Sequence, residues 1–269
     1  MKKLILFVFV AIISIFNCIN AQDIEYSKVE LEVKMDSILQ EAHLLFKYEQ
    51  AAWKTGDYVM SNKTLKKNYG GYLTYEDEKG LKTIVLSKDR KECAAVFFYS
   101  DNLPEFSIRD KREFSGKEKN LIKIYDNIVS QLSSSEYELD VPNGYNLNLD
   151  LIPCEDGYKM YVLTGTSQSK VIPFGNDYLF FADDNGEITS WQKFHSRLIS
   201  LPTQMEGKKV RSQTHSHLRT TPLITATEIA TFMLYAPLYK INEFSVYSPA
   251  IGKHIKYDLK SDKIIVSNK

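Results

Sequence analysis

The chain has 269 residues, with 34 basic and 34 acidic side chains and no cluster of basic residues. This balance argues against nucleic acid or an anionic membrane as the partner. The length suits one large domain or two modest ones, and 17 tyrosines with 14 phenylalanines favour a fold rich in β-strands.

The first 21 residues have the pattern of a secretory signal peptide. Two lysines precede an apolar run over residues 4–16, and the small residue Ala21 precedes a plausible cleavage point. The run is too short and too close to the N-terminus for a membrane span. We therefore expect export to the periplasm or the extracellular space, with no transmembrane segment in the mature chain.

The three cysteines leave two questions open. Cys18 lies in the signal region, but Asn17 precedes it where a lipoprotein has a small residue, which makes a lipid anchor at Cys18 unlikely. Cys93 and Cys154 are able to form a disulfide in an oxidising compartment. Alternatively, each is a small buried apolar residue.

The first elements of the mature chain are a long helix and a group of strands. Apolar residues recur at steps of three and four over residues 23–55, and Gly56 ends the pattern. Short aromatic and β-branched runs separated by charged turns follow over residues 70–100. They predict an antiparallel meander.

A second helix has a clear start signal. Ser115 and Glu118 have the spacing of a capping box, and an apolar stripe then continues to about Leu132. The next segment, residues 133–144, is polar and rich in turn formers. We place a domain boundary there, so that the predicted N-terminal domain covers residues 22–139; the segment also fits a long loop inside one domain.

The predicted C-terminal domain, residues 140–269, is richer in strands. Aromatic and β-branched runs alternate with turn signals up to residue 217, a helix is expected over residues 226–235 with Pro237 as its stop, and two strands follow, 243–249 and 254–259. The fold class is α+β, with mostly antiparallel sheet, a long N-terminal helix, a central helix and a C-terminal helix after a His-x-His strand.

A candidate metal site occupies the start of this last helix. His215 and His217 are two residues apart, so on a strand both imidazoles point to the same face. Glu228, in the first helical turn, can supply a carboxylate. Histidine and carboxylate ligands suit zinc, so we predict that His215, His217 and Glu228 bind a zinc ion.

The same glutamate has a structural explanation. Thr225 and Glu228 have the spacing of a capping box, in which the carboxylate accepts a hydrogen bond from the threonine backbone. Metal binding and helix capping therefore compete for the same two oxygen atoms. The spacing alone leaves both open.

The order of these residues resembles the signature of the MPN-type (JAMM) metalloproteases: His-x-His, seven residues, Ser, two residues, Asp. Here Thr225 stands in place of the serine and Glu228 in place of the aspartate, with the spacing kept. The run GNDYL and the motif together also resemble a family of secreted bacterial proteins, which implies no particular activity.

The metalloprotease resemblance implies roles for individual residues. His215, His217 and Glu228 would be zinc ligands, and Thr225 would help to polarise a scissile carbonyl. An upstream glutamate would be the general base, for which Glu187 is weakly preferred over Glu155. His195, expected on the preceding strand, would supply a third nitrogen or orient the water, or is an ordinary half-buried residue.

Two classes of function follow. The first is an exported zinc-dependent peptidase or amide hydrolase that acts on a peptide or protein substrate. The alternative is a non-enzymatic secreted binding protein, with either a degenerate metalloprotease-like domain or a purely structural metal site. A general base close to the metal-bound water separates the two.

Overall fold

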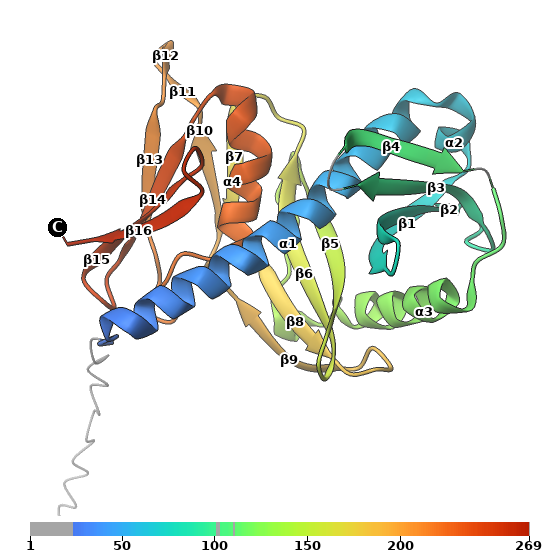
Figure 1. The fold of residues 1–269 in the computed structure, drawn as a ribbon, viewed down its shortest axis with the longest axis horizontal. Helices are drawn as coiled ribbons and strands as arrows, with labels where there is room; N and C mark the ends of the chain where they lie inside the picture. Colours follow the sequence, from blue (N-terminus) through green and yellow to red (C-terminus); the bar gives the residue numbers. More distant parts are fainter. Residues whose placement is uncertain (1–23, 101–102, 110, 269) are drawn as a thin grey trace, which may run out of the picture.

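The computed structural model describes residues 24–100, 103–109 and 111–268, and it has the predicted α+β architecture of helices with mostly antiparallel sheets (Figure 1). The predicted signal peptide, with Cys18, lies outside these residues. In the part of the chain that is described, no helix is both long and apolar enough to cross a membrane.

The long helix α1 (Lys28–Ser61) runs beside both halves of the molecule (Figure 1). It begins at a capping box of Ser27 and Glu30. The prediction that it ends at Gly56 was wrong, because the helix continues for one more turn. Thr55 and Val59, on either side of this glycine, are both fully buried, so core packing outweighs the low helix propensity of glycine. The short helix α2 (Lys63–Lys67) follows.

The N-terminal sheet confirms the predicted meander and adds a strand to it. All its neighbours are antiparallel, in the order β1 (Tyr69–Asp77), β2 (Gly80–Ser87), β3 (Cys93–Ser100) and β4 (Leu103–Arg109). The last of these was not predicted. Helix α3 (Gly116–Gln131) starts at the predicted Ser115–Glu118 capping box.

The middle of the molecule is an antiparallel sheet of four strands. Their order is β5 (Tyr145–Cys154), β6 (Gly157–Thr166), β8 (Tyr178–Ala182) and β9 (Ile188–Lys193). Between α3 and this sheet lies the 3-10 helix η1 (Ser135–Tyr137). Two small antiparallel pairs complete this part: β7 (Val171–Gly175) with β10 (Leu198–Pro202), and β11 (Gln204–Met205) with β12 (Lys208–Lys209).

The C-terminal sheet has one parallel pair. Its order is β13 (Ser212–Ser216), β14 (Glu243–Ser248), β15 (Lys253–Asp258) and β16 (Lys263–Ser267), with β13 and β14 parallel. Helix α4 (Ala226–Tyr239) makes the crossover between them, as a parallel connection requires. The strand β16 was not predicted.

Helix α4 passes the expected stop at Pro237 and ends two residues later. A proline removes one backbone N–H from a helix, and here it does so only in the last turn. The preceding residues of α4 are buried from Ala226 to Ala236, so tertiary packing holds the helix to its end.

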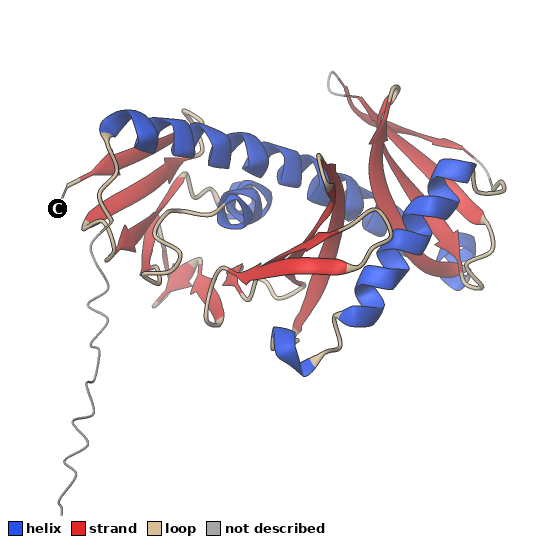
Figure 2. Cartoon of the chain, turned by 90° about the horizontal axis from the view of Figure 1, so that it is seen from below, coloured by secondary structure: helices blue, strands red, loops and turns tan. Residues whose placement is uncertain are grey.

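Both main cores draw on residues from both sides of the boundary predicted at residue 139. One core joins Leu45 and Tyr48 of α1 to Phe232 of α4 and Phe244 of β14. The helices α1 and α4 lie side by side, as Figure 2 shows with α4 seen end-on. The second core joins α3 to strands of the N-terminal and middle sheets. The division into two domains stays a prediction.

Cys93 and Cys154 are both free thiols, so of the two alternatives left open by the sequence, the buried apolar residue applies to Cys93. Its side chain is fully buried, and the thiol donates a hydrogen bond to the Ala95 carbonyl at 3.0 Å. Burial raises the pKa of this thiol to about 11, so Cys93 is an unreactive core residue.

Candidate metal centre

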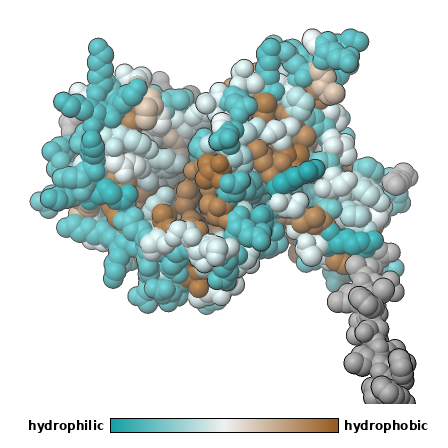
Figure 3. Space-filling view, turned by 180° about the vertical axis from the view of Figure 1, so that it is seen from behind, coloured by the Kyte–Doolittle hydropathy of each residue, from teal (hydrophilic) through white to brown (hydrophobic). Residues whose placement is uncertain are grey.

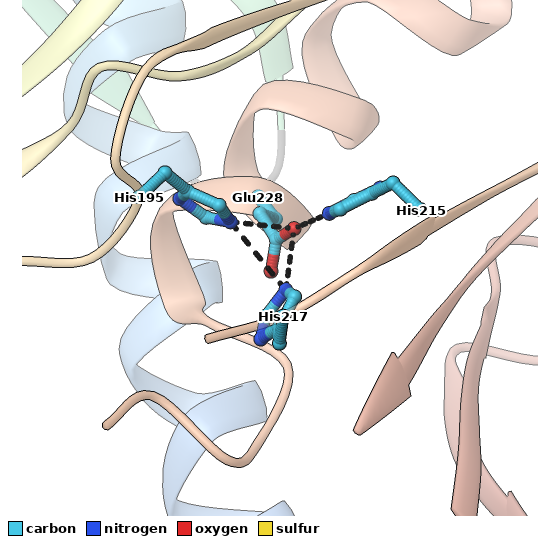
Figure 4. A group of neighbouring side chains, drawn as sticks. All are labelled: His195, His215, His217 and Glu228. Atoms are coloured by element: carbon cyan, nitrogen blue, oxygen red, sulfur yellow. Dashed lines mark hydrogen bonds and ion pairs between the residues drawn. The ribbon is translucent and has the colours of Figure 1, made fainter. Parts of the chain in front are cut away.

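Three histidines and one glutamate converge where three segments meet (Figure 4). His195 lies in the loop between β9 and β10, His215 on β13 and His217 directly after it, and Glu228 in the first turn of α4. His195, His217 and Glu228 are buried, whereas His215 is partly exposed. Even the His215 side chain is only 9% exposed, so the whole group is largely shielded from solvent.

The four candidate ligand atoms are close enough together to bind one metal ion. Glu228 Oε1 lies 2.6 Å from His215 Nε2, 3.0 Å from His217 Nε2 and 3.2 Å from His195 Nε2. The Nε2 atoms of His195 and His217 are 3.4 Å apart, and all four ligand atoms lie within 4.8 Å of one another. Zinc bonds of about 2.0–2.1 Å in tetrahedral geometry place ligand atoms about 3.3 Å apart, so most of these separations already match.

Two of the imidazoles are held from behind by their other nitrogen. His195 Nδ1 lies 2.7 Å from Asp177 Oδ1, and His217 Nδ1 donates to the Thr221 carbonyl at 3.1 Å. The hydroxyl of Thr227 donates to the second oxygen of Asp177. With Nδ1 protonated, each Nε2 has its lone pair directed at the centre of the group, the arrangement typical of metal-bound histidine.

His215 differs from the other two histidines. Its Nδ1 is buried and has no hydrogen-bond partner among the described residues. Its ring instead lies against Phe174, with centroids 5.8 Å apart. Packing, rather than an outer hydrogen bond, therefore orients this imidazole.

Glu228 caps the helix and faces the histidines at the same time. Its Oε2 accepts hydrogen bonds from the Thr225 backbone N–H at 2.9 Å and the Thr225 hydroxyl at 3.0 Å, while Oε1 faces the three Nε2 atoms. The two explanations suggested by the sequence are therefore compatible. The cap fixes the carboxylate so that one oxygen remains directed at the histidines.

The buried carboxylates in and beside this group favour a positive charge among the four side chains. Burial lowers the pKa of His195, but the charges of Asp177 and Glu228 and the hydrogen bonds to them outweigh it and raise the pKa to about 11. Burial raises the pKa of Glu228, but the neighbouring His217, His195 and His215 hold it well below its usual range. Protons stabilise the group when no cation does, and a bound metal ion would replace them.

The other residues implied by the metalloprotease resemblance are not part of this group. The Thr225 hydroxyl is engaged in the helix cap. Glu187 lies in the β8–β9 turn, where its carboxylate accepts a hydrogen bond from Asn127 of α3 at 2.9 Å. Glu155 lies in the β5–β6 turn. The structure thus gives neither glutamate contact with the histidines.

His195 is the ligand that the sequence indicated most weakly. It lies on a loop and not on a strand, and the following strand, β10, pairs with β7 and not with β13. Asp177, its hydrogen-bond partner, lies in the Gly-Asn-Asp turn between β7 and β8. In the sequence, Asp177 could be interpreted as a carboxylate beside the site. The Gly-Asn-Asp run, however, is also typical of an ordinary turn.

The fold and the site together define an α+β protein with a buried three-histidine, one-glutamate group suited to a metal ion. No protein-family model matches the chain, and no curated protein is significantly similar in sequence. The function is therefore argued from the geometry of the site.

Proposed function

We propose that His195, His215, His217 and Glu228 bind one divalent transition-metal ion, with zinc as the first candidate. The observation that carries the proposal is the convergence of four ligand atoms within 4.8 Å, two of them on histidines oriented by Asp177 and Thr221. Imidazole nitrogen with one carboxylate oxygen is a donor set that zinc prefers.

A structural role for the ion fits this geometry best. Structural zinc sites take all four ligands from the protein, whereas catalytic sites take three and leave a position open for water. Here four protein ligands are present, and three of them are buried. The ion would join the β9–β10 loop, strand β13 and helix α4.

A zinc-dependent peptidase or amide hydrolase is the second candidate. The motif spacing supports it, because His215, His217, Thr225 and Glu228 resemble the metalloprotease signature. In such an enzyme the three histidines would hold the ion, and Glu228 would act as general base towards a water in the fourth position. Asp177 is unsuited to that role because both its oxygens are engaged.

Metal analysis of the purified protein tests the proposal. After zinc loading and removal of unbound metal, we expect one equivalent of zinc per chain, and less than a tenth of it in His215→Ala and His217→Ala. The chain has five histidines, which provides a matched control: His254→Ala, outside the group, should keep the full equivalent. The proposal would be overturned if His215→Ala and His217→Ala both kept the full equivalent of zinc.

The same zinc-loaded protein separates the two candidates. Incubation with an unstructured protein substrate such as casein should give no cleavage if the ion is structural. Cleavage that disappears in Glu228→Gln, with zinc still bound to the histidines, would establish the hydrolase instead.

A further inference from the structure

A groove away from the metal group is lined by several polar side chains, of which Glu49 is buried. It has a volume of about 510 Å³ and lies between α1, the strands β5 and β6, and the end of α4. Its lining includes Glu49, Trp53, Asn146, Asn148 and Tyr235. Seen from behind, the molecule shows apolar residues gathered between its two lobes (Figure 3).

One face of β5 is polar where a core strand would be apolar. Asn146, Asn148 and Asp150 alternate along this strand with three leucines, which pack into the core on the α3 side. Asparagine and aspartate have low strand propensity. Their repetition on the face that lines the groove therefore indicates a role other than folding.

These side chains form a continuous hydrogen-bonded chain into the interior. The amide of Asn146 donates to Asn148 Oδ1 at 2.7 Å, and the amide of Asn148 donates to Glu49 Oε2 at 2.8 Å. Gly165 of β6 leaves room for both amides, since a Cβ there would lie 2.8 Å from Asn146 Nδ2. The chain of amides ends at a carboxyl group that is only 4% exposed.

The carboxyl groups of Glu49 and Asp150 are both buried. Glu49 Oε1 and Asp150 Oδ2 have no hydrogen-bond partner among the described residues. Burial raises the pKa of both residues, and the charge of Glu49 raises that of Asp150 further. The floor of the groove therefore carries less charge than two ionised acids would.

Part of the lining of the groove is aromatic. Trp53 of α1 is 37% exposed, and its ring lies against Tyr235 of α4 with centroids 5.2 Å apart. Tyr72 and Tyr239 also line the groove. An exposed tryptophan face beside a row of side-chain amides can bind the C–H face and the hydroxyl groups of one ligand at once.

The charge of the lining limits the class of ligand. None of the described residues that line the groove is a lysine or arginine, so an anion finds no countercharge. Burial raises the pKa of Glu49 and so favours its neutral form, and Asp57 is exposed to water. Paired amide donors and acceptors beside an aromatic face suit a neutral polyhydroxylated molecule.

We propose that this groove binds a carbohydrate, with Trp53 stacking on a sugar ring and Asn146 and Asn148 hydrogen-bonding its hydroxyl groups.

An array of defined oligosaccharides, probed with the purified full chain, tests the proposal, followed by calorimetric titration with the strongest hit. We expect saturable binding that weakens about tenfold in Trp53→Ala, the loss of one aromatic stacking contact, and that also weakens in Asn146→Ala. Asn120→Ala, an exposed asparagine on α3, is the matched control and should bind as the wild type does.

Fluorescence locates the ligand without relying on the alanine variants. Trp53 and Trp191 are the two tryptophans of the chain, and Trp191 lies by Tyr137 and Phe180, away from the groove. In Trp191→Phe, the emission of Trp53 alone should shift on saturation with the sugar. Binding of no oligosaccharide, binding unaffected by Trp53→Ala, or saturation by spermidine in place of sugars would overturn the proposal.

Discussion

His195 Nδ1 lies 2.7 Å from Asp177 Oδ1, and both side chains are only 4% exposed. The pair joins two turns of the chain and directs the other nitrogen of His195 at Glu228. A buried carboxylate behind a histidine fixes its tautomer and strengthens its bond to a metal.

Asp177→Asn should therefore weaken zinc binding without removing a ligand. We expect the dissociation constant to rise about 10- to 100-fold, the usual effect of losing such a carboxylate. Competition with a chromophoric zinc chelator measures it. Asp184→Asn, in the exposed β8–β9 turn, is the control, and equal effects of the two substitutions would contradict the positioning role.

Two substitutions separate the cap from the ligand at the start of α4. Glutamine keeps the capping box at Glu228 but is a poor ligand, so Glu228→Gln should keep the helix start and bind zinc at least about tenfold more weakly. Thr225→Ala should cost about 1 kcal/mol of metal-free stability and retain one equivalent of zinc. Urea unfolding and metal analysis give both quantities. Unchanged zinc affinity in Glu228→Gln would show that Glu228 is only a cap.

Zinc should stabilise the folded chain through these same residues. At a free zinc concentration of about 100 times the dissociation constant, linkage predicts a gain of about 2.7 kcal/mol in the free energy of unfolding, provided that the unfolded chain does not bind zinc. The gain should disappear in His217→Ala and persist in His254→Ala. Thermal unfolding with and without a chelator checks this, and an unchanged midpoint would contradict a structural role.

A separate prediction concerns acid stability at the start of α3. The buried carboxylate of Glu118 accepts hydrogen bonds from Arg112, from Tyr75 and from the Ser115 backbone. Burial raises the pKa of Glu118, but these hydrogen bonds outweigh it and lower the pKa to about 2. This contribution to stability is complete above the ordinary pKa of 4.5 and is lost as the pH falls towards about 2.

Urea unfolding between neutral pH and about pH 3 tests the prediction. Because Arg112 is 39% exposed, solvent screening reduces the effect, and we expect the wild type to lose about 1–2 kcal/mol more than Glu118→Gln over this range. The neighbouring exposed residue supplies the control, since Glu113→Gln should follow the wild type. Parallel curves for all three proteins would contradict the prediction.

The sequence predicted the elements whose signals are local. The capping boxes at Ser115 and Thr225 gave both helix starts correctly. Both helix ends that were predicted from a single residue, Gly56 and Pro237, came too early, because the packing that extends these helices involves residues distant in sequence. The strands β4 and β16 were missed.

The residues of the candidate metal site also differ in how far the sequence predicted them. His215, His217 and Glu228 lie close in the sequence, and their spacing indicated a shared site. His195 enters from a loop between strands of two different sheets, so tertiary structure alone brings it to the group. One carboxylate oxygen of Glu228 contacts the helix cap and the other faces the histidines. The spacing of residues in the sequence does not determine where each oxygen points.

The most direct test of the proposed zinc site is an anomalous diffraction map from crystals of the zinc-loaded protein, recorded at the zinc absorption edge. We expect one peak per chain, surrounded by Nε2 of His195, His215 and His217 and by Oε1 of Glu228, at about 2.0–2.2 Å from each. A map without a peak at this position, or a peak whose nearest ligands are other residues, would contradict it.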